Sequence, residues 1–305
     1  MQINSFETPI LFIIFNNPET TEKVFNEIKK IKPKQLFLYS DGARTTVEGE
    51  NEKCNKCREI VKNIDWDCDF KINFREDNVG PRIAVSSAIN WFFDNVEEGI
   101  VLEHDCLPNA SFFIFCREML NHYRNDTRIM HISGNNFKNG KIYGDGSYYF
   151  SRIAHIWGFA TWKRAWKLYD VEMKAYESFK NSKQIDNIFD GYFVKKHIIK
   201  LLDKIAFRNS ATWDHQWNFA LFSNNGLSIN PNVNLIKNIG FGEGAVHCTD
   251  TSSKFADMKT EEINEIIHPS FILANKKADK ETLSYNFDFG LWTRIKREFT
   301  RTFKF

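Results

Sequence analysis

The sequence predicts an α/β protein with an open, mostly parallel sheet flanked by helices. In the first hundred residues, short runs of strand-forming apolar residues alternate with segments whose apolar residues recur at helical spacing. The first run, residues 9–15, is apolar almost throughout, which is typical of a strand buried on both faces. Alternating units of this length place parallel strands side by side and cover them with helices.

The individual elements follow in chain order. Asn16, Asn17 and Pro18 after the first strand indicate a turn and the start of a helix. That helix carries four apolar residues on one face, Val24, Phe25, Ile28 and Ile31. Further strands are expected over residues 35–39, 70–74 and 99–102, and further helices over residues 51–64, 83–96 and from about Asn109.

Composition restricts the class of protein. The chain has 305 residues, a formal net charge of +2, and 26% charged and 42% hydrophobic residues, which fits a folded globular protein. A near-neutral balance argues against a nucleic-acid partner bound through broad phosphate neutralisation. No apolar run is long enough for a membrane span and the N-terminus lacks a signal-peptide pattern, so we expect a cytoplasmic protein. The six cysteines include one close pair, Cys54 and Cys57, without the second pair of a zinc site.

Ligands of open α/β sheets bind outside the carboxyl ends of the strands. That rule selects four segments of this chain: Phe15-Asn16-Asn17, Ser40-Asp41-Gly42, residues 77–82, and Glu103-His104-Asp105. Neither a dinucleotide-binding glycine motif nor a P-loop is present, which excludes the two commonest nucleotide-binding patterns.

Glu103-His104-Asp105 follows a predicted strand directly. Two carboxylates that straddle one residue suit a hard cation such as Mn²⁺ or Mg²⁺, which binds one or two carboxylates together with substrate phosphates. The alternative is an acidic turn that caps the helix beginning near Asn109.

Two later segments also carry chemistry. Asp214 lies between aromatic residues, where its pKa can rise and allow general-base catalysis; the alternative, favoured by spacing alone, is an N-cap of the following helix. Gly240, Gly242 and Gly244 indicate a mobile loop of the kind that closes over substrates. His247 at its exit is a candidate metal ligand or a structural histidine.

The run from Val101 to Phe113, with Glu103-His104-Asp105 and Pro108-Asn109-Ala110-Ser111-Phe112-Phe113, resembles the metal-binding segment of GT-A-fold glycosyltransferases. The resemblance is greatest to bacterial nucleotide-diphospho-sugar transferases related to the N-acetylglucosaminyltransferase I family. Ile156-Trp157-Gly158-Phe159-Ala160 is similar to that family's Gly-Trp segment, and Trp213-Asp214 to its Trp-Asp step. Residues 231–247 are similar to its closing loop. The four motifs occur in the family's order.

The resemblance implies roles for particular residues. Asp105 would bind Mn²⁺ or Mg²⁺ at the donor diphosphate, with His247 as a second ligand, and Asp214 would be the catalytic base. The implied donor-binding residues are Phe15, Asn17, Asp41, Arg82, Glu103, His104 and Trp213. This chain departs from the family at two positions: His104 replaces the middle acid, and Asn17 stands where relatives often have Arg, which leaves Arg82 as the expected phosphate partner.

The implied fold is GT-A, with one catalytic domain over residues 1–290, divided into a nucleotide-binding half (about 1–108) and an acceptor half (about 109–250). The implied activity is metal-dependent, inverting transfer of a hexosyl or N-acetylhexosaminyl group. The donor is a nucleotide sugar, expected to be a UDP-sugar, and the acceptor a glycan or lipid-linked glycan of a bacterial surface polysaccharide or lipooligosaccharide. The alternatives are a non-catalytic nucleotide-sugar- or carbohydrate-binding protein of the same fold, and a nucleotidyltransferase.

The C-terminal tail, residues 291–305, has a charge pattern of its own. It contains five Lys or Arg residues and one Glu, a net charge of +4, and four apolar residues spaced three, four and four apart, Trp292, Ile295, Phe299 and Phe303. A basic amphipathic helix of this kind suits an anionic membrane surface, which predicts peripheral attachment at the inner face of the cell membrane. The alternative is a terminal helix packed on the protein itself or on a second subunit.

Overall fold

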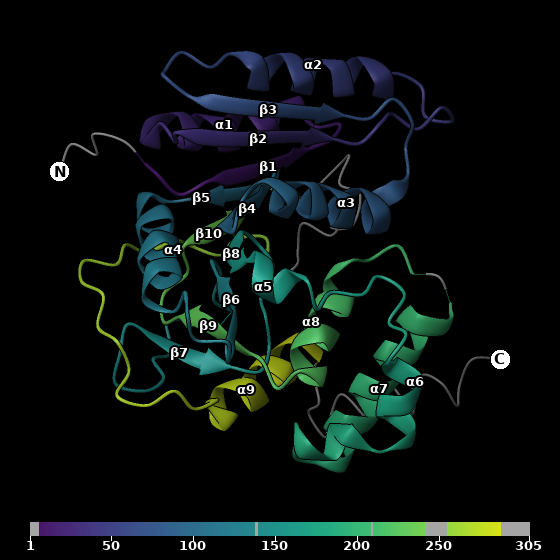
Figure 1. Cartoon of the computed structure of the whole chain (residues 1–305), viewed down its shortest axis with the longest axis vertical. Helices are drawn as coiled ribbons and strands as arrows, with labels where there is room; N and C mark the ends of the chain where they lie inside the picture. Colours follow the sequence, from purple (N-terminus) through teal and green to yellow (C-terminus); the bar gives the residue numbers. More distant parts are fainter. Residues whose placement is uncertain (1–5, 138–139, 209, 242–254, 288–305) are drawn as a thin grey trace.

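An eight-stranded sheet runs along the long axis of the molecule (Figure 1). The computed structural model describes residues 6–137, 140–208, 210–241 and 255–287. The predictions made for His247, for most of the glycine-rich loop and for the tail at 291–305 lie outside these residues. Across the sheet the strands are β3 (Asp69–Phe74), β2 (Gln35–Ser40), β1 (Ile10–Ile14), β4 (Glu98–Glu103), β8 (Phe159–Trp162), β6 (Ile129–Ser133), β9 (Leu227–Pro231) and β7 (Tyr148–Ser151).

Six of these eight strands point the same way. β3, β2, β1 and β4 are parallel to one another, β8 runs against β4 and β6, and β7 runs against β9. The predicted class, an α/β fold with an open, mostly parallel sheet flanked by helices, is therefore confirmed. The reversed strand β8 lies between β4 and β6 in the sheet, and the sequence pattern did not predict it.

Helices cover both faces of the sheet because residues alternate between the faces along each strand. Ile10, Phe12 and Ile14 of β1 pack against one set of helices, α1 (Pro18–Ile31), α2 (Glu50–Lys62) and α4 (Ala110–His122). Leu11 and Ile13 pack against the other set, α3 (Gly80–Asn95), α5 (Lys163–Trp166) and α8 (Asp214–Ser223). β1 is buried along its whole length, as its continuous apolar run predicts.

Two smaller groups of elements complete the fold. A small antiparallel sheet is formed by β5 (Cys106–Pro108) and β10 (Ile236–Asn238). The helices α6 (Tyr176–Asn181), η1 (Gln184–Asn187) and α7 (Tyr192–Phe207) share a separate apolar core with part of α8. In Figure 1 these helices lie beside the lower end of the sheet, and α9 (Lys276–Phe287) lies next to β7.

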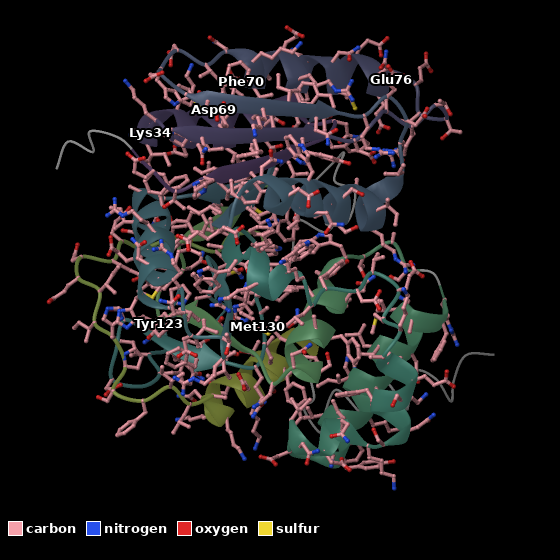
Figure 2. All side chains as sticks on the ribbon, viewed as in Figure 1. Lys34, Asp69, Phe70, Glu76, Tyr123 and Met130 are labelled. Atoms are coloured by element: carbon pink, nitrogen blue, oxygen red, sulfur yellow. The ribbon has the colours of Figure 1, made fainter. Side chains whose placement is uncertain are left out.

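Local signals in the first 110 residues place the elements within a few residues of the prediction. Asn17 caps α1 by accepting a hydrogen bond from the Thr20 N–H at 3.2 Å, and Asn109 caps α4 through the Phe112 N–H at 3.1 Å. Asn109, and not the acidic segment before it, therefore begins α4, so the capping interpretation of Glu103-His104-Asp105 is wrong. The strand β3 forms the edge of the sheet, where Phe70 (Figure 2) is 45% exposed.

None of the helices in the described chain combines the length and the apolar character that crossing a lipid bilayer requires.

A buried histidine joins the central sheet to α8. The indole N–H of Trp217 donates to His131 Nδ1 at 3.0 Å, and His131 Nε2 lies 2.9 Å from the carbonyl oxygen of His155. These partners require a neutral imidazole that carries its proton on Nε2, because a proton on Nδ1 would point at the indole N–H. Burial lowers the pKa of His131 to about 3, although the hydrogen bond to the His155 carbonyl acts in the opposite direction.

We predict that His131 makes the protein less stable in mild acid. Unfolding releases a histidine of ordinary pKa near 6.5 that binds a proton at pH 5, whereas the folded protein does not bind it. This group alone should therefore remove about 2 kcal/mol of unfolding free energy between pH 7 and pH 5. Urea denaturation of the wild type and of His131→Gln at both pH values measures the difference, since other groups titrate equally in both proteins. Equal losses in the two proteins would contradict the prediction.

Candidate active site

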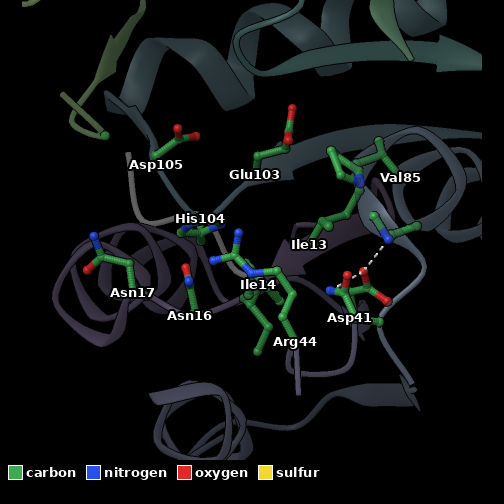
Figure 3. Close-up of a pocket in the computed structure, with 16 residues that line it drawn as sticks. Ile13, Ile14, Asn16, Asn17, Asp41, Arg44, Val85, Glu103, His104 and Asp105 are labelled. Atoms are coloured by element: carbon green, nitrogen blue, oxygen red, sulfur yellow. Dashed lines mark hydrogen bonds between the residues drawn. The ribbon is translucent and has the colours of Figure 1, made fainter. Parts of the chain in front are cut away.

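The register of the parallel strands brings three strand ends together. Ile13 of β1 pairs with Glu103 of β4, and Ile14 pairs with Ser40 of β2. The residues that follow these positions therefore meet at one edge of the sheet, where they line a pocket of about 170 Å³ (Figure 3). We call it the strand-end pocket. Its lining consists of Ile13, Ile14, Phe15, Asn16, Asn17, Asp41, Arg44, Asn78, Gly80, Pro81, Ala84, Val85, Glu103, His104, Asp105 and Gly240.

Six of the ten residues proposed from the sequence line this pocket: Phe15, Asn17, Asp41, Glu103, His104 and Asp105. They come from three different places in the chain, and only the sheet register brings them together. The local sequence signal for each was the same, a polar or aromatic residue directly after a buried strand.

Asp41 connects the end of β2 to the start of α3. Its carboxylate accepts hydrogen bonds from the backbone N–H groups of Gly42, Val79 and Gly80 at 3.0–3.2 Å, and from the Asn78 amide at 3.0 Å. Burial raises the pKa of Asp41, while these N–H donors and the Arg75 guanidinium act in the opposite direction. The carboxylate thus shapes the pocket wall by holding the backbone of residues 78–80 against β2.

The three residues at the end of β4 face different parts of the pocket. Figure 3 shows the side chains of Glu103 and Asp105 projecting the same way, with His104 turned toward Asn16 and Arg44. Burial raises the pKa of Glu103 to about 8, and the nearby carboxylates of Asp105 and then Asp214 add to the effect. Burial lowers the pKa of His104, and Asp105 partly opposes it. Glu103 and His104 therefore favour their uncharged forms at neutral pH.

Asp105 is held by the segment around β10. Its backbone carbonyl accepts the Ile239 N–H at 2.8 Å, and its carboxylate lies 3.4 Å from the Asn238 amide. Gly240 packs directly on it: a Cβ at Gly240 would lie 2.5 Å from the Asp105 Oδ2 atom. Only glycine leaves the carboxylate in place, which explains the first glycine of the glycine-rich segment.

Arg44 is a pocket residue that the sequence analysis missed. Its guanidinium forms a bidentate ion pair with Glu50, whose side chain is 1% exposed, and lies 5.7 Å from the centre of the Phe15 ring. The Asn16 amide donates to the same carboxylate at 2.7 Å. The signal available in the sequence was the position of Arg44, three residues beyond the strand-end Asp41.

Two predicted donor-binding residues lie elsewhere. The Arg82 guanidinium donates to the Val171 carbonyl at 2.8 Å and to the Glu172 carboxylate at 3.1 Å, which directs it toward the loop after α5. Trp213 is 5% exposed and packs on Phe159 of β8 with ring centres 5.8 Å apart. In the described chain both therefore lie outside the lining of the strand-end pocket.

Asp214 lines a second pocket. It is the first residue of α8, and the N-cap position belongs to Trp213. Within the described residues its carboxylate accepts no backbone N–H, so the N-cap interpretation is wrong; the side chain is 27% exposed and lies 4.0 Å from His215 Nδ1. The pocket is lined by Phe137, Ile153, Ala154, His155, Ile156, Trp157, Ile198, Leu201, Leu202, Asp214, His215, Asn218, Phe222 and Leu283.

An aromatic cluster spans the two pockets. Trp157 and Phe137 of the second pocket are in edge-to-face contact with ring centres 5.1 Å apart. Trp157 also meets Phe241, which follows Gly240 of the strand-end pocket, at 6.1 Å. The ring contact between Trp157 and Phe241 therefore places the two pockets next to each other.

Among the described residues, few side chains of the strand-end pocket can bind a metal ion. Within the described residues no group of three or more His, Cys, Asp or Glu side chains is arranged to hold a cation. Asp105 offers one carboxylate in an open pocket, with Glu103 two residues away. That set fits Mg²⁺ or Mn²⁺ bound by one or two carboxylates plus the oxygens of a bound diphosphate, and does not fit an all-protein cage.

The known proteins that resemble this chain do so only distantly, so its function is inferred from the geometry of the two pockets. No protein-family profile and no curated protein matches the chain. Among solved structures it is similar to HddC from Yersinia pseudotuberculosis (8% identity, 51% of this chain and 77% of that chain, TM-score 0.31). It is also similar to the UTP-bound UGPase from Acinetobacter baumannii (10%, 53% and 77%, 0.30). A third is the 4-diphosphocytidyl-2C-methyl-D-erythritol synthase from Anaerococcus prevotii (9%, 71% and 98%, 0.32). Likenesses this distant carry no functional argument.

We predict that neutralising either neighbouring carboxylate lowers the pKa of Glu103. Asp105→Asn should lower it more than Asp214→Asn, because Asp105 has the larger electrostatic effect. The carboxyl carbon of Glu103, assigned by comparison with Glu103→Gln, reports the pKa in a carbon-13 NMR titration. Asp94→Asn, which changes an exposed acid of α3, is the matched control and should leave the titration unchanged. A Glu103 pKa that Asp214→Asn leaves unmoved would mean that the two pockets are electrostatically separate.

Proposed function

We propose that this protein is a metal-dependent, inverting glycosyltransferase that moves a sugar from a nucleotide-diphosphate sugar to an acceptor hydroxyl. The single observation that carries the proposal is the juxtaposition of two pockets with different chemistry. One contains the strand-end acids and a guanidinium, and the adjoining one contains Asp214 above an apolar floor. A transferase binds two substrates and must bring the reacting atoms of donor and acceptor together, so it needs two adjacent sites.

The strand-end pocket would bind the donor. Apolar side chains on one wall, including Ile13, Pro81 and Val85, suit the face of a base, and Phe15 offers an aromatic ring beside them. Arg44 would meet the diphosphate, since Glu50, which also accepts a hydrogen bond from Asn16, holds the guanidinium in one position at the pocket edge. Arg44 replaces Arg82 in this role because Arg82 is bound to residues 171–172. Asp41 would contribute by positioning the backbone around the base.

Asp105 would be the protein ligand of a divalent cation at the donor diphosphate. When bound, such a cation stabilises the negative charge of the departing nucleoside diphosphate. Gly240 keeps the Asp105 carboxylate facing the pocket, and Asn238 restrains one of its oxygens. Glu103, two residues back and half-buried, would contact the donor sugar. His247 stays a proposed second ligand on sequence grounds alone.

Asp214 would act as the general base. Its carboxylate takes the proton of an acceptor hydroxyl, and the hydroxyl oxygen then attacks the anomeric carbon of the donor. The bond from that carbon to the diphosphate oxygen breaks, and the oxygen leaves with the electron pair. Attack from the side opposite the leaving group inverts the configuration. The aromatic cluster of Phe137, Trp157, Phe241 and Phe255 would exclude water from this junction.

The origin of the lining residues supports a donor site in the first half of the chain and an acceptor site in the second. The donor pocket draws most of its lining from residues 1–108, and the second pocket from residues after 109. The acceptor would be a glycan, or a glycan linked to a lipid, whose sugar presents a hydroxyl to Asp214. The apolar residues beneath that site, Ile198, Leu201 and Leu202, suit the less polar portion of such a molecule.

The decisive experiment is product analysis after incubation with a panel of nucleotide sugars and Mn²⁺. Slow release of nucleoside diphosphate supports the transferase. Formation or consumption of pyrophosphate with a nucleoside triphosphate would support a nucleotidyltransferase instead. Tight binding with neither product would indicate a non-catalytic nucleotide-sugar-binding protein.

We predict that Asp105→Asn abolishes Mn²⁺-dependent release of nucleoside diphosphate. The substitution preserves the size of the side chain beneath Gly240 but removes the charge that attracts the cation. Activity should also disappear in EDTA and return with Mn²⁺. Asp94→Asn is the control for loss of one exposed negative charge, and its rate should equal that of the wild type. Undiminished turnover in EDTA would remove the metal from the proposal.

We predict that Asp214→Asn lowers kcat by about 10²-fold or more, the usual effect of losing a general base. Donor affinity should change little, because Asp214 lies in the second pocket. The control is Asp190→Asn, which neutralises an acid whose side chain is 83% exposed. A near wild-type kcat for Asp214→Asn would exclude it as the base.

A further inference from the structure

The outward face of α7 carries a stripe of basic and aromatic residues. Phe193, Lys196, Lys200, Lys204 and Phe207 are exposed and follow one another at steps of three, four, four and three residues. This spacing places them along one side of the helix. Phe193 is 55% exposed, Phe207 is 61% exposed, and Tyr192 beside Phe193 is 66% exposed. We call these six residues the α7 stripe.

Every charged side chain of the stripe is positive. The single acid of α7, whose residues the structure describes in full, is Asp203, and its carboxylate accepts hydrogen bonds from the Tyr176 hydroxyl at 2.9 Å and the Lys180 ammonium at 2.7 Å. Lys195, which lies beside the stripe, pairs with Asp186 at 2.6 Å. Asp203 lies three residues after Lys200 and therefore on the same side of α7, but its charge is matched by Lys180, so the three lysines give this side of the helix a net positive charge.

The opposite face of the same helix is buried. Ile198, Leu202 and Ile205 pack into the apolar core shared with α6 and α8, and Leu201 joins Ile198 and Leu202 in lining the second pocket. The inner residues thus satisfy the packing needs of α7 completely. The ring of Phe207 lies 5.9 Å from that of Tyr176, yet Phe207 stays 61% exposed, and Tyr192 and Phe193 at the other end of the stripe are 66% and 55% exposed. Large exposed apolar side chains that are grouped together mark interaction surfaces.

We propose that the α7 stripe binds the surface of an anionic lipid bilayer. Lysine side chains keep their ammonium groups at the headgroups while their methylene stems cover apolar surface. Aromatic side chains at the two ends can enter the interface between headgroups and acyl chains, and anionic lipids attract the lysine row. A soluble polyanion would use the lysines but gain little from Tyr192, Phe193 and Phe207, so the aromatic residues favour a membrane.

This surface would place the second pocket close to the membrane. The stripe and the pocket lie on opposite faces of one helix, whose diameter with side chains is about 10 Å. A lipid-linked acceptor in the bilayer would then pass beside α7 to reach Asp214. Only this consequence rests on the proposed transfer reaction. Membrane binding itself is independent of activity, so the two proposals fail separately.

The test is co-sedimentation of the full chain with vesicles at physiological ionic strength. Phosphatidylcholine vesicles with and without phosphatidylglycerol provide anionic and neutral surfaces. Wild type should bind the anionic vesicles and not the neutral ones. Lys196→Glu/Lys200→Glu should lower the partition coefficient by about 30-fold or more, from the attraction of two lysines. Tyr192→Ser/Phe193→Ser should lower it by about tenfold or more.

The matched control is Lys53→Glu/Lys56→Glu, which changes the net charge equally on the exposed face of α2 and should bind within about threefold of wild type. Thermal unfolding verifies that each variant is folded. No binding of wild type to anionic vesicles overturns the proposal. Binding of Lys196→Glu/Lys200→Glu at the wild-type level also overturns it, because another segment, such as residues 291–305, would then be responsible for attachment. If the control variant lost binding equally, the attraction would not be specific to the α7 stripe. If the aromatic variant bound fully, the aromatic residues would not contribute, and the stripe would instead suit soluble polyanions.

Discussion

The candidate site depends on the parallel register of β1 with its two neighbours. β1 is buried on both faces, so its backbone can pair only with β2 and β4, and its apolar side chains lock that pairing from above and below. A shift of one residue would exchange Ile13 and Ile14 between the two cores. Because the register cannot slip, Phe15, Asp41 and Glu103 emerge at the same level and line one pocket.

Burial then determines the charges in that pocket. Asp41 satisfies its carboxylate with backbone N–H groups, Glu50 satisfies its own with Arg44 and Asn16, and both acids serve to position other groups. Glu103 and Asp105 have few such partners, which leaves them available to a ligand. We therefore propose that Asp41 and Glu50 have structural roles, whereas Glu103 and Asp105 contact the ligands.

The second half of the chain supplies a second pocket and an exposed helix face, which the parallel sheet does not provide. The reversed strand β8 carries Phe159, on which Trp213 packs, and this contact places Asp214 at the edge of the sheet near Glu103. The helices after α5 surround an additional pocket and present the α7 stripe on their outer side. We propose that the sheet binds the donor, while this helical addition receives the acceptor and directs the molecule toward a membrane.

Local patterns in the sequence determined the first four strands, the first four helices and the strand-end residues, because period-two and period-3.6 hydrophobic patterns and Asn caps act within a few residues. They also identified six residues of the strand-end pocket. The tertiary structure alone decided which arginine enters it. Arg44 and Arg82 both follow strand ends, yet Arg82 finds Val171 and Glu172 some ninety residues away, whereas Arg44 finds Glu50 only six residues on. It likewise decided that Asp214 faces a pocket instead of capping its helix, because packing of Trp213 on Phe159 sets the start of α8. Contacts between residues so distant in the chain leave no periodic signal in the sequence, so only the folded chain reveals them.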